Sequence, residues 1–244
     1  MSLPTLLISD LHLEPSRPKL TQGLIDFLEQ HKGACARLFI LGDLFEAWIG
    51  DDDDNALSDA IAAALKAFAD EGAEIGLMHG NRDFLLGEAY AARCGARLMP
   101  ETEIIESDGE RFLLMHGDSL CTDDTDYQSF RKQVRQPAWQ SAFLSQSLDA
   151  RRAFAEQARS QSKSATAGKS QEIMDVNAAA VLDCLRRFEV TQLVHGHTHR
   201  PATHSIDDPA LALSATRSVL GDWGDTAVIG RLSEGSLDLI EISL

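Results

Sequence analysis

The stretch Thr5-Leu6-Leu7-Ile8-Ser9-Asp10-Leu11-His12 decides the fold, because a short apolar run passes directly into a carboxylate and an imidazole. An apolar run of this length predicts a strand buried inside a sheet. The same arrangement, an apolar run that ends in polar residues, recurs at residues 37–41, 74–78, 111–115 and 191–194. We therefore expect five buried strands, each followed by polar side chains at its carboxyl end.

Helical patterns separate the early strands. One helix is expected over about residues 19–31 and a second over residues 58–71, where Ser58 would cap the start and Gly72 would end the helix. Strand, helix and strand in this order predict βαβ units. Asp108-Gly109 and Glu234-Gly235 each stand between two apolar runs, which is typical of hairpins. The expected fold is an α/β sandwich of two mixed β-sheets flanked by helices.

The segment 125–170 differs from the rest of the chain. It has helical patterns and no strand runs, so we interpret it as a helical insertion in one core formed by residues 1–124 and 171–244. It holds 8 Lys and Arg against 3 acidic residues, although the whole chain carries −16. A solvated basic face remains an alternative. Near-helical spacing predicts a stripe that packs on the core, formed by Trp139, Phe143, Leu144 and Leu148.

Composition limits the class of protein. The 244 residues are 44% hydrophobic, which is enough for a sizeable core. The net charge of −16 argues against a nucleic-acid binder, since such proteins displace phosphate counterions with a basic face. The four cysteines form no CxxC pair, which predicts reduced, mostly buried thiols. We find no signal-peptide pattern and no apolar run of about 18 residues that could cross a membrane.

Residue types that bind metal ions stand after all five strands. Asp10 and His12 follow the first strand and would point the same way if the backbone stayed extended. The others are Asp43, Asn81, His116, His197 and His199. The carboxyl ends of strands meet at one edge of an α/β sheet, so distant residues can converge there. Oxygen and imidazole ligands suit manganese, iron or zinc, and two ions about 3.5–4 Å apart can activate water against a phosphoryl group.

Several residues near these positions have two interpretations. Asp83 and Asp118 adjoin candidate ligands and either orient them or form turns and caps. His79 and His195 lie inside apolar runs, where a packed or orienting role is favoured over an additional ligand. The acidic run 51–54 lacks the spaced ligands of a calcium loop, so a solvated loop is expected. Neither a serine-hydrolase elbow nor a P-loop is present. A serine hydrolase and a P-loop nucleotide hydrolase are therefore not indicated, and metal-dependent chemistry is the remaining interpretation.

Taken in order, the motifs DLH, GDLFE, GNRD, HGD and GHTH resemble those of the calcineurin-like metallophosphoesterases. More narrowly, the chain resembles the UDP-2,3-diacylglucosamine pyrophosphohydrolase family over nearly its whole length. The matching segments are GDLFEAWIGDD (42–52), HGNRDFLLG (79–87), CTDD (121–124), IMDVN (173–177) and HGHTHRP (195–201). The resemblance implies a hydrolase of lipid A synthesis that cleaves a nucleotide-linked lipid to UMP and 2,3-diacylglucosamine 1-phosphate.

The resemblance also implies two Mn²⁺ ions per chain, with Asp43 bridging them. The implied ligands of one ion are Asp10, His12, Asp43 and His199. Those of the other are Asp43, Asn81, His116 and His197. The implied catalytic residues are Asp43, Asn81, Arg82 and His116. Most members of the wider superfamily have His where this chain has Arg82, so we expect this permanently charged side chain to stabilise the diphosphate rather than donate a proton.

The family's substrate contacts carry over to both the core and the insertion, which would form a lid that encloses the acyl chains. They are Asn81, Arg82, Asp124, Ser162, Thr166, Lys169 and His197. Lys169 would be a second cation for the diphosphate. Many relatives have Asn where this chain has Thr166, whose hydroxyl can replace only part of the hydrogen bonding of an amide.

The resemblance implies a monomer in the cytoplasm, bound peripherally to the inner membrane. Basic residues of the insertion would contact anionic lipid, namely Arg131, Lys132, Arg135, Arg151 and Arg152. Two rival hypotheses stay open. A broad phosphoesterase acting on soluble nucleotides would not need the insertion, and a non-catalytic scaffold would be expected to have lost ligands.

Overall fold

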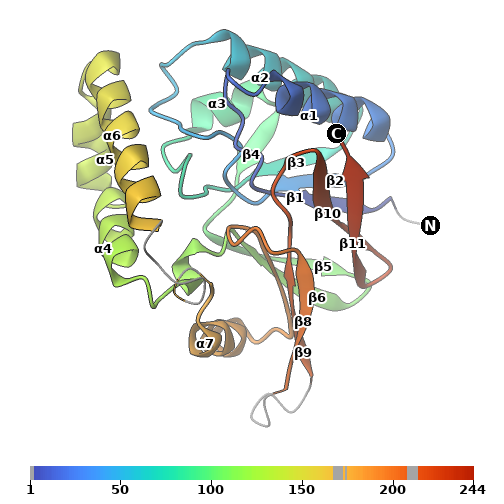
Figure 1. The fold of residues 1–244 in the computed structure, drawn as a ribbon. Helices are drawn as coiled ribbons and strands as arrows, with labels where there is room; N and C mark the ends of the chain where they lie inside the picture. Colours follow the sequence, from blue (N-terminus) through green and yellow to red (C-terminus); the bar gives the residue numbers. More distant parts are fainter. Residues whose placement is uncertain (1–2, 167–172, 174, 208–213) are drawn as a thin grey trace.

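Two mixed β-sheets pack against one another at the centre of the molecule (Figure 1). The computed structural model describes residues 3–166, 173, 175–207 and 214–244. The first sheet has the order β11-β10-β1-β2-β3-β4 and the second the order β5-β6-β7-β9-β8. The strands are β1 (Thr5–Ile8), β2 (Arg37–Ile40), β3 (Glu74–Leu77), β4 (Ala96–Leu98), β5 (Thr102–Ser107), β6 (Glu110–Met115), β7 (Gln192–His195), β8 (Ala202–Ile206), β9 (Ala215–Val219), β10 (Thr226–Ser233) and β11 (Ser236–Ser243). The expected fold class is confirmed.

Both sheets combine parallel and antiparallel strands. Strands β1 to β4 run parallel, and β10 joins them antiparallel beside β1. Strands β6, β7 and β9 run parallel, with β5 and β8 antiparallel at the two edges. Because parallel strands end at the same edge, the loops after β1, β2, β3, β6 and β7 can meet.

Helices cover the outer faces of both sheets. The first sheet is covered by α1 (Pro18–His31), α2 (Ala56–Ala69) and α3 (Glu88–Arg93), and the second by α7 (Ala178–Phe188). Apolar side chains fill the space between the sheets, among them Leu7, Phe39, Phe112, Leu114 and Val194. The buried layers fix the strand ends against one another, which a site assembled from several loops requires.

The predicted hairpins are confirmed, whereas the start of α2 differs from the prediction. Asp108-Gly109 and Glu234-Gly235 have positive φ at both residues, as a two-residue hairpin turn requires. The N-cap of α2 is Asn55, not Ser58. Its side chain accepts a hydrogen bond of 3.0 Å from the Ser58 N–H, and the Ser58 hydroxyl accepts from the Asn55 N–H, so this capping box starts the helix at Ala56.

Three helices stand together along one side of the molecule (Figure 1). They are α4 (Thr125–Val134), α5 (Pro137–Leu144) and α6 (Leu148–Thr166). Phe143 is buried in the main core, and Trp139 and Leu148 pack beside it. The predicted apolar stripe is therefore confirmed except at Leu144, which is 40% exposed. The division of the chain into a core and an insertion stays a prediction.

The remaining expectations from composition concern thiols and membrane spans. All four cysteines are free, and three are buried, as predicted. Among the residues that the structure describes, none of the helices has the length and apolar character needed to cross a membrane.

Candidate metal centre

The loops that carry the predicted ligands have a strained backbone. φ is 56° at Asp10, 49° at His12, 53° at Asp43, 65° at His197 and 54° at His199. The prediction of an extended backbone from Asp10 to His12 is therefore wrong. Left-handed conformations are uncommon outside glycine, and each costs about 1–3 kcal/mol. Such a conformation persists only where the surrounding structure enforces it. Such strain is typical of positions that a site requires.

Two close backbone approaches hold the aspartates in place. A Cβ at Gly80 would lie 2.0 Å from Asp43 Oδ1, and one at Gly196 would lie 2.2 Å from Asp10 Oδ2. The backbone N–H of Arg82 donates to Asp43 Oδ1 at 2.8 Å, and that of His197 donates to Asp10 Oδ2 at 2.8 Å. One oxygen of each carboxylate is thus fixed by the backbone, and the other is left to face the cluster.

The first half of the cluster is formed by Asp10, His12 and His199. Asp10 Oδ1 is buried without a hydrogen bond. His199 Nε2 lies 3.3 Å and His12 Nε2 lies 4.0 Å from this oxygen, and the two nitrogens are 3.2 Å apart. Three ligand atoms therefore point toward one centre.

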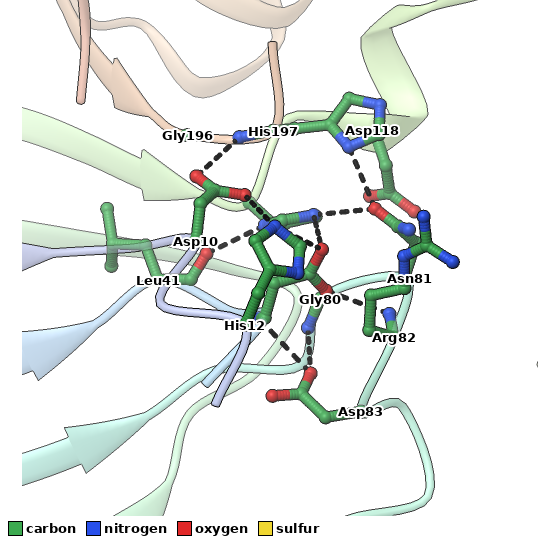
Figure 2. Close-up of polar contacts among 12 residues, drawn as sticks. Asp10, His12, Leu41, Gly80, Asn81, Arg82, Asp83, Asp118, Gly196 and His197 are labelled. Carbon is green, nitrogen blue, oxygen red and sulfur yellow. Dashed lines mark hydrogen bonds and ion pairs between the residues drawn. The ribbon is translucent and has the colours of Figure 1, made fainter. Parts of the chain in front are cut away.

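The second half contains Asn81 and His197, which lie next to one another in Figure 2, and Asp43 joins it to the first half. Asp43 Oδ2 lies 3.8 Å from His12 Nε2 and 3.8 Å from His116 Nε2, so it stands between the two halves. Asn81 Oδ1 lies 3.0 Å from His116 Nε2 and 2.8 Å from His197 Nδ1. The structure thus brings all seven predicted ligands together.

The electrostatics of the cluster favour a bound cation. Burial raises the pKa of Asp43 to about 6, although His116 and His12 act to lower it. Burial acts to lower the pKa of His12, but the carboxylates of Glu46, Asp43 and Asp10 raise it to about 9. A divalent ion would let Asp43 ionise and His12 give up its proton, so both shifts would be relieved by metal binding.

The donor set fits two divalent ions. Each half presents carboxylate or amide oxygen together with imidazole nitrogen, and no thiolate takes part, which suits manganese, iron or zinc. His116 Nδ1 lies 2.9 Å from the Leu41 carbonyl oxygen and therefore donates its proton there. The lone pair of His116 Nε2 is then directed into the cluster, as for other histidines that bind metal ions.

Asp83 and Asp118 hold the loops rather than the ligand side chains. Asp83 accepts hydrogen bonds from the backbone N–H groups of Gly80 and Leu44, both at 2.7 Å, so it ties together the loops after β2 and β3. Asp118 accepts from the Tyr127 hydroxyl at 2.6 Å and from Arg131 Nε at 2.7 Å. Through these contacts Asp118 attaches α4 to the edge of the site.

His79 and His195 are hydrogen-bonded residues outside the cluster, which agrees with the prediction that they are not additional metal ligands. His79 Nε2 lies 2.6 Å from the Leu86 carbonyl oxygen. His195 is fully buried, and burial together with Arg217 lowers its pKa to about 3, so the ring is neutral. Its Nδ1 donates to the Gly196 carbonyl at 2.8 Å, which leaves Nε2 to accept from Arg217 Nη1 at 3.1 Å.

Glu46 belongs to the site although the sequence analysis did not single it out. Its Oε2 lies 2.8 Å from His12 Nδ1, on the side of the ring away from the cluster. Its Oε1 lies 2.8 Å from Arg159 Nη2 of α6. Burial acts to raise the pKa of Glu46, but His12 and the nearby arginines, Arg82 and Arg159, lower it to about 2. The available signal was its place in GDLFE, three residues after Asp43.

The acidic run 51–54 is a loop in which Asp52 and Asp54 are exposed, as expected, but all four carboxylates have partners, which was not expected. Asp51 accepts hydrogen bonds from the Gly87 and Tyr90 N–H groups and from the Trp48 indole. The other three carboxylates form ion pairs with Arg side chains, in the pairs Asp52–Arg151, Asp53–Arg152 and Asp54–Arg93. The run therefore attaches α6 and α3 to the core.

These pairs change the interpretation of the basic residues of the insertion. Arg151 is only 2% exposed, and it also donates to the Ile49 carbonyl at 2.7 Å, so its predicted membrane contact is wrong. Arg131 pairs with Asp118 and Glu101, and Arg135 donates to the Gly80 carbonyl at 2.8 Å. Most of the predicted basic surface is therefore used to dock α4 and α6.

The predicted substrate residues are only partly within the described chain. Arg82 lies beside the cluster, and its Nε is buried without a hydrogen-bond acceptor, as expected of a side chain that awaits an anion. Asp124 caps α4 by accepting from the Tyr127 N–H at 3.1 Å. Lys169 and the side chains of Ser162 and Thr166 lie outside the described residues.

A dinuclear ligand cluster at the strand ends of two mixed sheets defines a metallophosphoesterase. The profile of the calcineurin-like phosphoesterase family matches residues 3–201. A UDP-2,3-diacylglucosamine hydrolase of Xanthomonas oryzae pv. oryzae (strain PXO99A) is 47% identical over 99% of this chain and 100% of its own length. A UDP-2,3-diacylglucosamine hydrolase of Cellvibrio japonicus (strain Ueda107) is 52% identical over 90% of each chain.

The chain belongs to the calcineurin-like phosphoesterase family, and within it to the same family as these two relatives. It is accordingly a metal-dependent hydrolase, and the family binds its ions at a dinuclear site. Among solved structures, the E. coli phosphoesterase YfcE matches with a TM-score of 0.46 and 15% identity over 99% of each chain.

Proposed function

We propose that this protein hydrolyses the diphosphate bond of UDP-2,3-diacylglucosamine and releases UMP and 2,3-diacylglucosamine 1-phosphate, a step of lipid A biosynthesis. The observation that carries the proposal is the convergence of all seven ligand side chains beside Arg82, whose buried Nε has no acceptor among the described residues. Full-length relatives named UDP-2,3-diacylglucosamine hydrolase support the choice of substrate. A scaffold would have no reason to keep five ligand residues in strained backbone conformations.

The ligands divide into two sets that share Asp43. Asp10, His12, Asp43 and His199 would hold one ion. Asp43, Asn81, His116 and His197 would hold the other. When bound, two Mn²⁺ ions would supply an activated water and neutralise charge on the phosphoryl oxygens. The manganese assignment rests on family resemblance, because the donor set alone also suits iron and zinc.

Arg82 is proposed to stabilise the charge that develops on the diphosphate. Its backbone N–H is anchored on Asp43 Oδ1, which places the side chain next to the bridging carboxylate. A guanidinium keeps its charge and offers two parallel N–H donors to phosphate oxygens. Whichever phosphorus is attacked, the leaving group is a stable phosphate monoester anion, so Arg82 does not need to donate a proton.

The insertion is proposed to act as a lid over the acyl chains, with Ser162, Thr166, Lys169 and Asp124 as contacts. Its inner aromatic cluster supports this role, since the rings of Trp139 and Phe143 stack at 5.0 Å and Phe154 lies 5.3 Å from Phe143. Exposed apolar side chains, Phe130, Leu144 and Phe154, line the same helices. They would also support peripheral contact with the cytoplasmic face of the inner membrane by a monomer.

The test is metal-dependent release of UMP from UDP-2,3-diacylglucosamine, measured with Mn²⁺ and with chelator. We expect activity only with metal, and its loss in His116→Ala and Arg82→Ala. Lys132→Ala, an exposed position on α4, is the control that should retain activity. Equal cleavage of soluble nucleotide esters would favour a broad phosphoesterase, and no hydrolysis of any ester would favour the scaffold.

A further inference from the structure

A cavity of about 200 Å³ opens beside the loop that carries His197 and His199. Thr198, the residue between these two ligands, lines it together with Arg200 and Asp175, and β8 and β9 contribute His204 and Arg217. Figure 1 shows β8 and β9 well away from α5 and α6, so the cavity belongs to a different side of the centre from the insertion. None of the predicted substrate contacts that the structure describes, Asn81, Arg82, Asp124 and His197, lines this cavity.

Two groups in the cavity leave hydrogen-bonding capacity unused among the described residues. Thr198 Oγ1 is buried without a hydrogen bond. Arg217 is half-buried and donates from Nη1 to the neutral ring of His195, whose Nε2 accepts at 3.1 Å. No carboxylate of the described residues forms an ion pair with Arg217, and burial acts to lower its pKa. A buried hydroxyl without a partner is costly, and burial offsets the stabilisation that Asp175 gives to Arg217, so both groups favour a ligand rich in acceptors.

The cavity also offers an acceptor in a fixed position. Asp175 receives a hydrogen bond of 2.7 Å from Arg200 and one of 2.8 Å from the Val176 N–H. Each carboxylate oxygen has further lone pairs, so Asp175 can still accept from a ligand N–H. Donors from Arg217 and Thr198 opposite one fixed acceptor match the edge of a uracil ring, which has two carbonyl groups on either side of one N–H.

We propose that this cavity, here called the nucleotide pocket, binds the uridine half of the substrate. The inference rests on the proposed function, because it states where one half of the proposed substrate binds. At about 200 Å³ the cavity is small for the acyl chains, and its charged and hydroxyl side chains are groups to which a nucleoside can form hydrogen bonds. The lipid then lies on the side of α4–α6, the diphosphate at the ligand cluster, and the uridine against β8 and β9.

The experiment measures UMP binding to the metal-loaded protein by calorimetry, with metal content verified for each variant. We expect Arg217→Met to weaken UMP binding by about tenfold to a hundredfold, the usual loss for a hydrogen bond to a charged donor. His204→Ala, which changes an exposed residue of β8, should weaken it by a smaller factor. Affinity for 2,3-diacylglucosamine 1-phosphate should change less than twofold. Arg231→Met, at an exposed arginine of β10, is the matched control.

A second comparison tests the choice of base. UMP should bind more tightly than CMP, because N3 of cytosine carries no proton for Asp175, and Asp175→Asn should reduce this preference. Unchanged UMP affinity in both Arg217→Met and His204→Ala would overturn the inference, as would equal affinity for UMP and inorganic phosphate. If the unmodified protein cleaves UDP-2,3-diacylglucosamine while these results fail, the proposed function stands and only the pocket is wrong.

Discussion

Glu46→Gln is expected to weaken metal binding without removing a ligand. Glu46 Oε2 lies 2.8 Å from His12 Nδ1, so its negative charge favours a proton on this nitrogen and leaves the lone pair of Nε2 for an ion held with Asp10 and Asp43. Glutamine keeps the size but loses the charge, and its amide nitrogen can repel the imidazole N–H. Carboxylates that orient metal-binding histidines are worth about 10–100-fold in metal affinity. This corresponds to about 1.4–2.7 kcal/mol.

The assay is competition between the protein and a fluorescent chelator for Mn²⁺, which reports affinity independently of activity. Glu14→Gln is the matched control, since Glu14 also faces Arg159, at 3.6 Å, but among the described residues the carboxylate that pairs with His12 Nδ1 is that of Glu46. The expected result is weaker binding of one ion in Glu46→Gln and unchanged binding in Glu14→Gln. Equal affinities in the two variants and the unmodified chain would refute an orienting role for Glu46.

Three further predictions concern the guanidinium, the docking of α6 and the protons of the site. Arg82→Lys should lower kcat by about 10²–10³-fold with unchanged metal content, since an ammonium lacks the fork that binds phosphate; equal turnover would contradict the role. Asp52→Asn should increase the rate of amide hydrogen exchange in α6. The loss of docking free energy should be about 1 kcal/mol or less, because Asp52 is largely exposed although Arg151 is buried. Unchanged exchange would contradict the docking contact. Because the pKa of His12 is raised to about 9, its proton favours the metal-free fold at neutral pH and must leave when an ion binds. Apparent metal affinity should therefore rise by up to about tenfold per pH unit until pH 9 and then level off, and a flat profile between pH 7 and 9 would exclude this competition.

The part of the site that could be predicted from sequence is the part that depends on strand ends. Asp43 and His116 follow apolar runs directly, and a parallel sheet brings such ends together whatever the details of the loops. The backbone conformation could not be predicted in this way. Asp10 and His12 have positive φ because the loop must pass the backbone of residues 42–44, to which it forms hydrogen bonds, and that contact is set by tertiary packing.

The partners of charged groups were the least predictable feature. Arg151 reaches Asp52 and the Ile49 carbonyl across about a hundred residues of sequence, and local composition contains no sign of this contact. A run of four Asp is usually solvated, which is why the sequence favoured a loop at residues 51–54. Glu46 was missed for the same reason, since its role exists only once His12 and Arg159 are placed beside it.

The uneven charge of the chain has a structural explanation in these pairs. The insertion is basic and the rest of the chain is strongly acidic, so attraction between them favours docking of α4–α6 on the core. Pairs at both ends of the interface, Arg131–Asp118 and Arg151–Asp52, fix its register. Between them Arg159 meets Glu46, which in turn holds His12. Arg131 and Arg151, which suggested a membrane surface, thus dock the insertion, and Arg159 connects it to the ligand cluster, so the position of α6 and the orientation of a metal ligand are physically linked.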